Sequence, residues 1–214
     1  RAAAVKFQTP MFERYGAKGF EALERVLYAA RQMGVITIVD CLRGGLSTTI
    51  SAIADAYFKP GAPLLADAIT LLPYYGARSL NGLITEALEN GRGVFIASLT
   101  SNPEGMSLQT ALRQSGDYKG RTVAYGIAST AQKHNVDIEG MGSVGLNHRC
   151  HHTANGCRIP AWTPPSSPVR FFPPVRLAGC RGQGSENPCS AVRAATCWSP
   201  CPALSPRMGR ISPH

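Results

Sequence analysis

The sequence predicts an α/β fold in which parallel strands are joined by right-handed helical crossovers. Short β-branched or apolar runs alternate with longer amphipathic segments over residues 1–146, the pattern of repeated strand–helix units. Such alternation is built either as a doubly wound sheet or as a (β/α)₈ barrel. No G-x-G-x-x-G or G-x-x-x-x-G-K-[ST] motif follows any of the runs, which disfavours a dinucleotide-binding fold and a P-loop.

Each expected strand is a short run bounded by Gly, Pro or polar residues. The strands are expected at residues 2–7, 35–40, 66–71, 93–99 and 142–146. The helices between them carry apolar residues at spacings of three and four, which predicts one buried stripe along each helix. One stripe is formed by Phe20, Leu23, Leu27 and Ala30, and another by Ile50, Ile53, Ala54 and Tyr57.

Charge and cysteine content divide the chain near residue 146. Residues 1–146 hold 14 Lys and Arg against 12 Asp and Glu, whereas residues 147–214 hold eight Arg, no Lys and one acid, Glu186. The net charge of +9 therefore comes mostly from this tail, which also holds six of the seven cysteines and eleven of the sixteen prolines. We expect a partial barrel domain over 1–146 and a disordered or frame-shifted tail over 147–214.

The chain is expected to be soluble and cytoplasmic, without a membrane partner. No apolar run approaches the roughly 18 residues of a membrane-spanning helix. The N-terminal segment "RAAAVKFQTP" has a strand-sized apolar run and lacks the pattern of a signal peptide.

The tail has three interpretations. Cys197 and Cys201 have the spacing of a structural zinc pair, but no second pair lies at a matching distance, so no metal site is expected. Arginines without compensating acids suit phosphate contacts, yet we expect no nucleic-acid partner. A shifted reading frame explains more: read one base later, with suitable codons, "NHRCHHT" can encode Thr-Ile-Val-Ala-Thr-Thr, which would continue the strand at 142–146. Sequencing the source DNA across codon 146 tests this hypothesis.

Candidate functional residues lie where the expected strands end. In a (β/α)₈ barrel the chemistry is at the C-terminal ends of the strands. Four such ends carry polar or unusual residues: Lys6, Asp40, the turn at Pro73 and Tyr74, and "TSNPEG" at 100–105. A helix cap or a loop breaker explains each of them singly, whereas together they favour a site. Lys6 and Asp40, on strands adjacent in sequence, are expected to form a cation–carboxylate pair over the barrel mouth.

Four segments carry a family resemblance. In order along the chain they are "VKFQTPMFERYG", "IVDCLRGGLSTT", "ADAITLLPYYGARSL" and "GRGVFIASLTSNPEG". They resemble consecutive segments of orotidine 5′-phosphate decarboxylases of the actinobacterial type, over residues 1 to about 146. The resemblance implies a homodimeric (β/α)₈ barrel without a cofactor, incomplete in this chain, that removes CO₂ from orotidine monophosphate (OMP) to give UMP. It also implies that the family's first strand would lie upstream of Arg1.

The family's hallmark is a D-x-K-x-x-D motif, with a second lysine on the strand before it. Lys6 matches that second lysine, and Asp40 matches the first aspartate of the motif. Leu42 stands at the position of the proton-donating lysine, and Gly45 at that of the second aspartate, which reaches the neighbouring subunit's site. The resemblance therefore implies that half of the catalytic tetrad is replaced.

The remaining matches concern substrate binding. Thr49 matches a threonine that crosses the dimer interface, and Ser101 and Asn102 match a loop that contacts the pyrimidine. The turn at Pro73 and Tyr74 also matches. In the tail, "AGCRGQG" partly matches the family's phosphate loop through Gln183 and Gly184. The pyrimidine nucleotide, OMP or UMP, is the implied ligand.

Loss of the lysine has a mechanistic consequence. Decarboxylation leaves a carbanion at C6 of the ring, so the site needs a fixed cation and a proton donor. Leucine supplies neither, and we expect impaired turnover. The alternative is a non-catalytic paralogue that binds a pyrimidine nucleotide or pairs with an active subunit. A third possibility, a sister barrel acting as a sugar-phosphate lyase or aldolase, matches "TSNPEG" and "PYYG" less closely.

Overall fold

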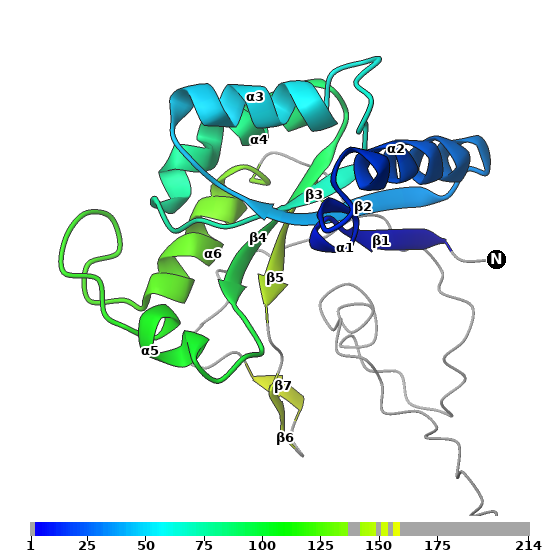
Figure 1. Ribbon diagram of the computed structural model, residues 1–214. Helices are drawn as coiled ribbons and strands as arrows, with labels where there is room; N and C mark the ends of the chain where they lie inside the picture. Colours follow the sequence, from blue (N-terminus) through cyan, green and yellow to red (C-terminus); the bar gives the residue numbers. More distant parts are fainter. Residues whose placement is uncertain (1–2, 137–141, 149–150, 154–155, 159–214) are drawn as a thin grey trace, which may run out of the picture.

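A parallel sheet of five strands forms the body of the computed structural model (Figure 1). The structure describes residues 3–136, 142–148, 151–153 and 156–158. The strands of the sheet are β1 (Ala4–Gln8), β2 (Ile36–Arg43), β3 (Ala68–Leu71), β4 (Gly93–Leu99) and β5 (Val144–His148). These runs confirm the five expected strands, shifted by at most three residues at their ends.

Helices occupy the connections between the strands. They are α1 (Pro10–Glu13), α2 (Gly16–Gln32), α3 (Ser47–Tyr57), the 3₁₀ turn η1 (Ala77–Leu80), α4 (Asn81–Glu89), α5 (Gly105–Gln109) and α6 (Val123–Lys133). A short antiparallel pair, β6 (His151–Thr153) and β7 (Gly156–Arg158), follows β5. Helix α2 ends where Gly34 takes φ 66°, because the N–H groups of Gly34 and Val35 then bond the carbonyls of Arg31 and Ala30.

The strand order separates the two folds that alternation alone allowed. The strands pair in sequence order, β1-β2-β3-β4-β5, and every pair is parallel. A doubly wound sheet reverses its order and carries helices on both faces. Here α2, α3, α4 and α6 all pack into one hydrophobic core with the same face of the sheet. Sequential order with helices on one face is the arrangement of a barrel wall.

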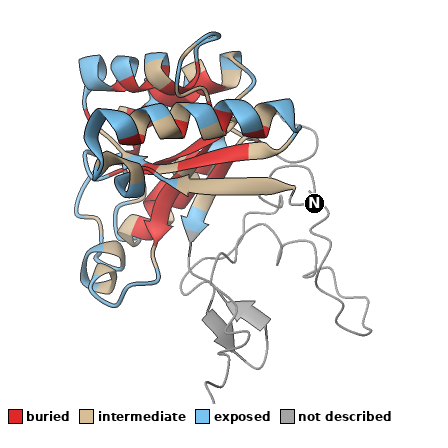
Figure 2. Cartoon of the chain, turned by 45° about the vertical axis from the view of Figure 1, so that its right-hand side comes forward, coloured by how far each residue is buried: buried red, intermediate tan, exposed pale blue. Residues whose placement is uncertain are grey.

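The core explains which strand residues face the helices (Figure 2). Val39 and Cys41 of β2 belong to the helix-facing core, as do Ile69 and Leu71 of β3. Both expected helical stripes are confirmed, with Phe20 only partly buried at the edge. Since side chains alternate along a strand, the even-numbered residues of β2 and β3 face the opposite side, which is the interior of a barrel.

Asp67 fixes the N-terminal ends of three neighbouring strands. Its carboxylate accepts bonds of 2.8 Å from the backbone N–H and the hydroxyl of Thr37, beside the start of β2. Its second oxygen accepts a 2.7 Å bond from Arg92, which precedes β4. This network lies at the end of the sheet opposite the expected site. We therefore infer that it fixes the register of the strands and stabilises the fold.

Candidate functional site

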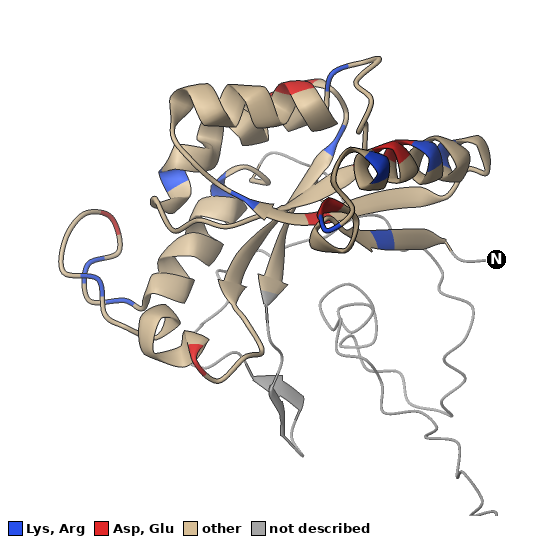
Figure 3. Ribbon diagram, in the orientation of Figure 1, with Lys and Arg blue, Asp and Glu red and all other residues tan. Residues whose placement is uncertain are grey.

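Charged residues are scarce on the sheet and concentrated in two strands (Figure 3). Within the five strands of the parallel sheet, the charged side chains are Lys6 in β1 and Asp40 and Arg43 in β2. Arg43 forms an ion pair with Glu13 of α1. The other two form the expected site pair.

Lys6 and Asp40 meet on the interior face of the sheet. The Lys6 Nζ donates to Asp40 Oδ2 at 2.7 Å, and the two side chains are 23% and 11% exposed. Parallel pairing places Lys6 beside Ile38 and Gln8 beside Asp40, so the long lysine side chain reaches forward to the carboxylate. At this exposure the attraction is stronger than at an open surface, because water screens the charges less.

Thr70 of β3 holds the other oxygen of the carboxylate. Its hydroxyl donates to Asp40 Oδ1 at 2.8 Å, and its Oγ1 accepts the backbone N–H of Leu42 at 2.9 Å. Thr70 is buried, and sequence analysis did not identify it. The available signal was a hydroxyl residue at an inward position of the otherwise apolar strand "AITL".

Leu42 adopts a backbone conformation that leucine rarely takes. Its φ is 43°, in the left-handed region, and its side chain is 46% exposed. The strand was expected to end at Asp40, and this expectation was wrong: β2 runs on to Arg43, with an irregular register between Val39 and Arg43. The irregularity places the strained residue two positions after Asp40, on the same strand. A left-handed L-residue costs roughly 1–2 kcal/mol, so the surrounding structure imposes this geometry.

Gly45 and Thr49 touch at the start of α3. Gly45 is buried, and a Cβ built on it would lie 2.8 Å from Thr49 Cγ2. Thr49 itself is exposed. A side chain at position 45 would therefore require the Thr49 side chain to rotate.

The other expected site residues lie in the loops that follow β3 and β4. Pro73 is buried and Tyr74 is exposed, with its ring edge-on to that of Tyr75. Ser101 and Asn102 are exposed in the loop after β4. Since both strands are parallel to β2, these loops leave the same edge of the sheet as Asp40. Gln183 and Gly184 lie outside the described residues.

Hydrogen bonds organise the loop after β4. The Thr100 hydroxyl donates to Asn102 Oδ1 at 2.6 Å, and Gln109 bonds both the hydroxyl and the N–H of Thr100 at 2.7 Å. The Asn102 amide donates to the Glu104 carboxylate at 3.2 Å. The pKa of the Glu104 carboxyl is lowered mainly by a hydrogen bond from its own backbone N–H, and further by this bond from Asn102. The loop thus presents Asn102 in a defined orientation.

Cys41 is a buried thiol behind the site. Burial raises its pKa to about 11, and it donates weakly to the Thr70 carbonyl at 3.5 Å. It belongs to the helix-facing core and is assigned a packing role.

Among the residues that the structure describes, no three His, Cys, Asp or Glu gather as a metal site would require. The described helices include none that is long and apolar enough to cross a membrane.

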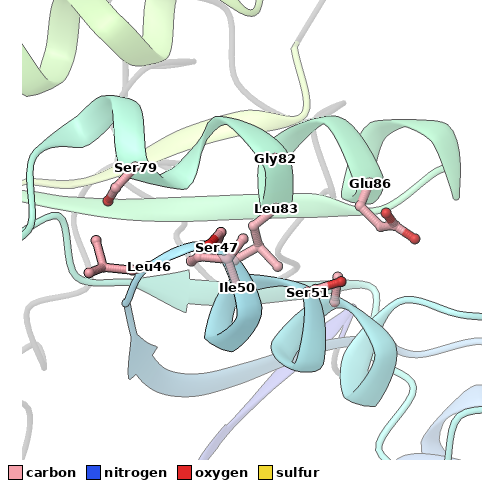
Figure 4. Close-up of a pocket in the computed structure, with 9 residues that line it drawn as sticks. Leu46, Ser47, Ile50, Ser51, Ser79, Gly82, Leu83 and Glu86 are labelled. Atoms are coloured by element: carbon pink, nitrogen blue, oxygen red, sulfur yellow. The ribbon is translucent and has the colours of Figure 1, made fainter.

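A groove of about 450 Å³ lies on the helical face, between α3 and α4 (Figure 4). Leu46, Ser47, Ile50 and Ser51 form one side of it, and Ser79, Gly82, Leu83 and Glu86 form the other. None of the expected site residues lines this groove. We therefore place the candidate site away from this groove, at the edge of the sheet where β1 and β2 end and where Lys6 and Asp40 pair.

Comparison with known proteins shows what this chain is similar to. A family model described as orotidine 5′-phosphate decarboxylase / HUMPS family matches residues 1–159. The orotidine 5′-phosphate decarboxylase of Salinispora arenicola is 40% identical over 146 residues, 68% of this chain and 51% of that protein. That of Streptomyces coelicolor is 38% identical over 145 residues, with the same two shares. The chain spans about half the length of the curated relatives it matches.

Solved structures show the same likeness. A Streptomyces avermitilis protein assigned as orotidine 5′-phosphate decarboxylase superposes with a TM-score of 0.66 at 36% identity, over 71% of this chain and 52% of that one. The Leishmania donovani OMP decarboxylase gives 0.51 at 33% identity, over 67% of this chain and 51% of that one. Together with the sequential strand order, these matches confirm the (β/α)₈ fold class, to which the described parallel sheet contributes five strands.

Proposed function

Because the chain belongs to the orotidine 5′-phosphate decarboxylase / HUMPS family, we propose that it is a decarboxylase-like protein of pyrimidine biosynthesis with impaired turnover. The proposed reaction converts OMP to UMP and CO₂, as a cytoplasmic lyase without a cofactor. The observation that carries the proposal is the ion pair of 2.7 Å between Lys6 and Asp40 at the barrel mouth. The family resemblance implies that such a cation–carboxylate pair lies beside the carboxylate of the substrate.

The proposed roles are those that the family resemblance implies for these residues. Lys6 and Asp40 are the charged groups beside the reacting carbon. Pro73, Tyr74, Ser101 and Asn102 contact the nucleotide from the loops at the same edge of the sheet. Thr49 contributes to a neighbouring subunit's site in a homodimer, and Gln183 and Gly184 contact the phosphate.

Leu42 is the reason for proposing impaired turnover. The carbanion that forms on CO₂ loss needs a fixed cation and a proton at the moment of reaction. An apolar side chain at position 42 provides neither. Loss of a positioned acid and its charge slows such a step by at least about 10³.

The test is release of CO₂ from OMP by the full chain and by four variants. The variants are Leu42→Lys, Gly45→Asp, their combination, and Leu72→Lys as a control at a similarly exposed leucine on the adjacent strand end. We expect the combination to recover more activity than the single changes together, because the new charges act in one network. The control should recover none. Rapid turnover with Leu42 in place would show that the catalytic lysine has been misassigned.

A second candidate function is favoured by the same residue. A chain without the proton donor can still bind a pyrimidine nucleotide, or pair with an active subunit, without turning OMP over. Calorimetric binding of UMP or OMP combined with absence of CO₂ release would favour this alternative. Sedimentation of the chain alone and mixed with an active relative would test the dimer.

A further inference from the structure

The chain between α5 and α6 forms a hairpin, the green loop at the left of Figure 1. Its two arms pair through an antiparallel bridge between Leu112 and Thr122. One position further in, the N–H of Arg113 donates to the Arg121 carbonyl, and the N–H of Gly120 donates to the Arg113 carbonyl, both at 2.9 Å. With Gly120 at φ 77°, these bonds form the pattern of a G1 β-bulge. Two arginines therefore occupy opposed positions on the two arms.

This pair of like charges has no carboxylate partner. Side chains at opposed positions of an antiparallel pair start roughly 5 Å apart, and like charges there are destabilising. The hairpin has one acid, Asp117, and its carboxylate lies 3.6 Å from Lys133 Nζ of α6. Among the residues that the structure describes, no carboxylate forms an ion pair with Arg113 or Arg121. A bound anion would offset this repulsion.

Arg113 lies against the first turn of α6. A Cβ built on Gly126 would be 2.5 Å from its Nη1 and 3.0 Å from its Cδ, so the glycine leaves the room that this side chain occupies. The Nε of Arg113 is buried and has no hydrogen-bond partner among the described residues. The guanidinium is thus partly desolvated and unpaired, and a counter-charge stabilises it more than it would at an open surface.

Arg121 is held beside the same turn of α6. Its Cζ lies 5.3 Å from the centre of the Tyr125 ring, and Tyr125 directly precedes Gly126. The Tyr125 ring packs edge-on against Tyr118 of the hairpin, with the ring centres 5.7 Å apart. This aromatic contact joins the hairpin to α6. Both arginines therefore lie at one end of a braced surface on which basic residues gather (Figure 3).

We propose that the hairpin and the first turn of α6 bind a phosphate group, either as the free ion or as a phosphate monoester, through Arg113 and Arg121. Each guanidinium offers parallel donors that match two oxygens of a phosphate, and the two cations balance its two negative charges. Binding offsets the repulsion between the arginines. This surface shares no residue with the proposed nucleotide site.

The test is calorimetric titration of the full chain with inorganic phosphate and with glycerol 3-phosphate, at an ionic strength held constant with chloride. We expect the wild type to bind with a dissociation constant of about 1 mM or less, and Arg113→Gln and Arg121→Gln each to weaken binding at least about tenfold. Arg14→Gln is the matched control and should bind as the wild type does, because Arg14 is exposed and lies 5.2 Å over the ring of Tyr15. Tighter binding of the free ion or of the ester identifies which of the two is the ligand.

Gly126→Ala tests the geometry without changing a charge. The added Cβ displaces the Arg113 guanidinium, so the affinity should fall at least about fivefold. Gly82→Ala in α4 is the control and should bind as the wild type does, since its Cβ would come no nearer than 3.8 Å to another side chain. Circular dichroism checks that every variant is folded. Absence of phosphate binding by the wild type, or equal affinity in the wild type and both arginine variants, would overturn the inference.

Discussion

Thr70 donates its hydroxyl to the carboxylate of Asp40 at 2.8 Å, from the adjacent parallel strand. The same oxygen accepts the N–H of Leu42 at 2.9 Å. One buried hydroxyl thus fixes both the charged residue of the site and the left-handed residue that follows it.

Removal of this hydroxyl should destabilise the protein more than removal of the neighbouring methyl group. Thr70→Val keeps the volume but leaves the Leu42 N–H without its acceptor, at a cost of about 1–3 kcal/mol. Thr70→Ser keeps both hydrogen bonds and loses one methyl group, at a cost of about 1 kcal/mol. Urea unfolding midpoints measure the difference. Equal midpoints for the two variants would contradict the role assigned to the hydroxyl.

Leu42→Gly should relieve backbone strain. Glycine takes φ 43° without penalty, which offsets its loss of conformational entropy, so the variant should be as stable as the wild type or more stable by up to about 1 kcal/mol. Leu72→Gly is the matched control, because Leu72 is 44% exposed against 46% for Leu42 and has an ordinary φ. The control should lose about 1 kcal/mol or more. Thermal unfolding of both variants checks this, and a similar loss in each would argue against strain at Leu42.

A side chain at position 45 should depend on Thr49. The Cβ of Gly45→Ala would meet Thr49 Cγ2 at 2.8 Å, whereas serine at position 49 lacks that methyl group. We therefore expect Gly45→Ala to cost less in a Thr49→Ser background, with a coupling of about 0.5–1 kcal/mol. A double-mutant cycle on unfolding free energies measures it. Strict additivity would show that Thr49 rotates away freely.

The buried thiol should make stability fall in alkaline solution. The pKa of Cys41 is raised by burial to about 11 from an ordinary 9.0, so the unfolded chain loses this proton first as the pH rises. Its contribution is fully present below about pH 9 and is lost between pH 9 and 11, with a slope near 1.4 kcal/mol per pH unit. Unfolding free energies of wild type and Cys41→Ala across this range give the slope difference. Parallel curves would mean that the thiol titrates normally in the folded protein.

The sequence by itself determined the strand–helix alternation and most of the core. Helical spacing identified the buried stripes of α2 and α3, because apolar residues on one helical face have no other stable place than the core. Strand ends also identified Lys6 and Asp40, since parallel strands bring their C-terminal ends to one edge. Their direct contact agrees with that expectation.

Only the tertiary structure decided what lies around that pair. Alternation of elements cannot distinguish a barrel wall from a doubly wound sheet, because the difference lies in strand order and in which face the helices cover. The role of Thr70 depends on the register between β2 and β3, and the conformation of Leu42 on an irregularity in that pairing. Neither is encoded in a local run of residues, since each is set by contacts between segments nearly thirty positions apart.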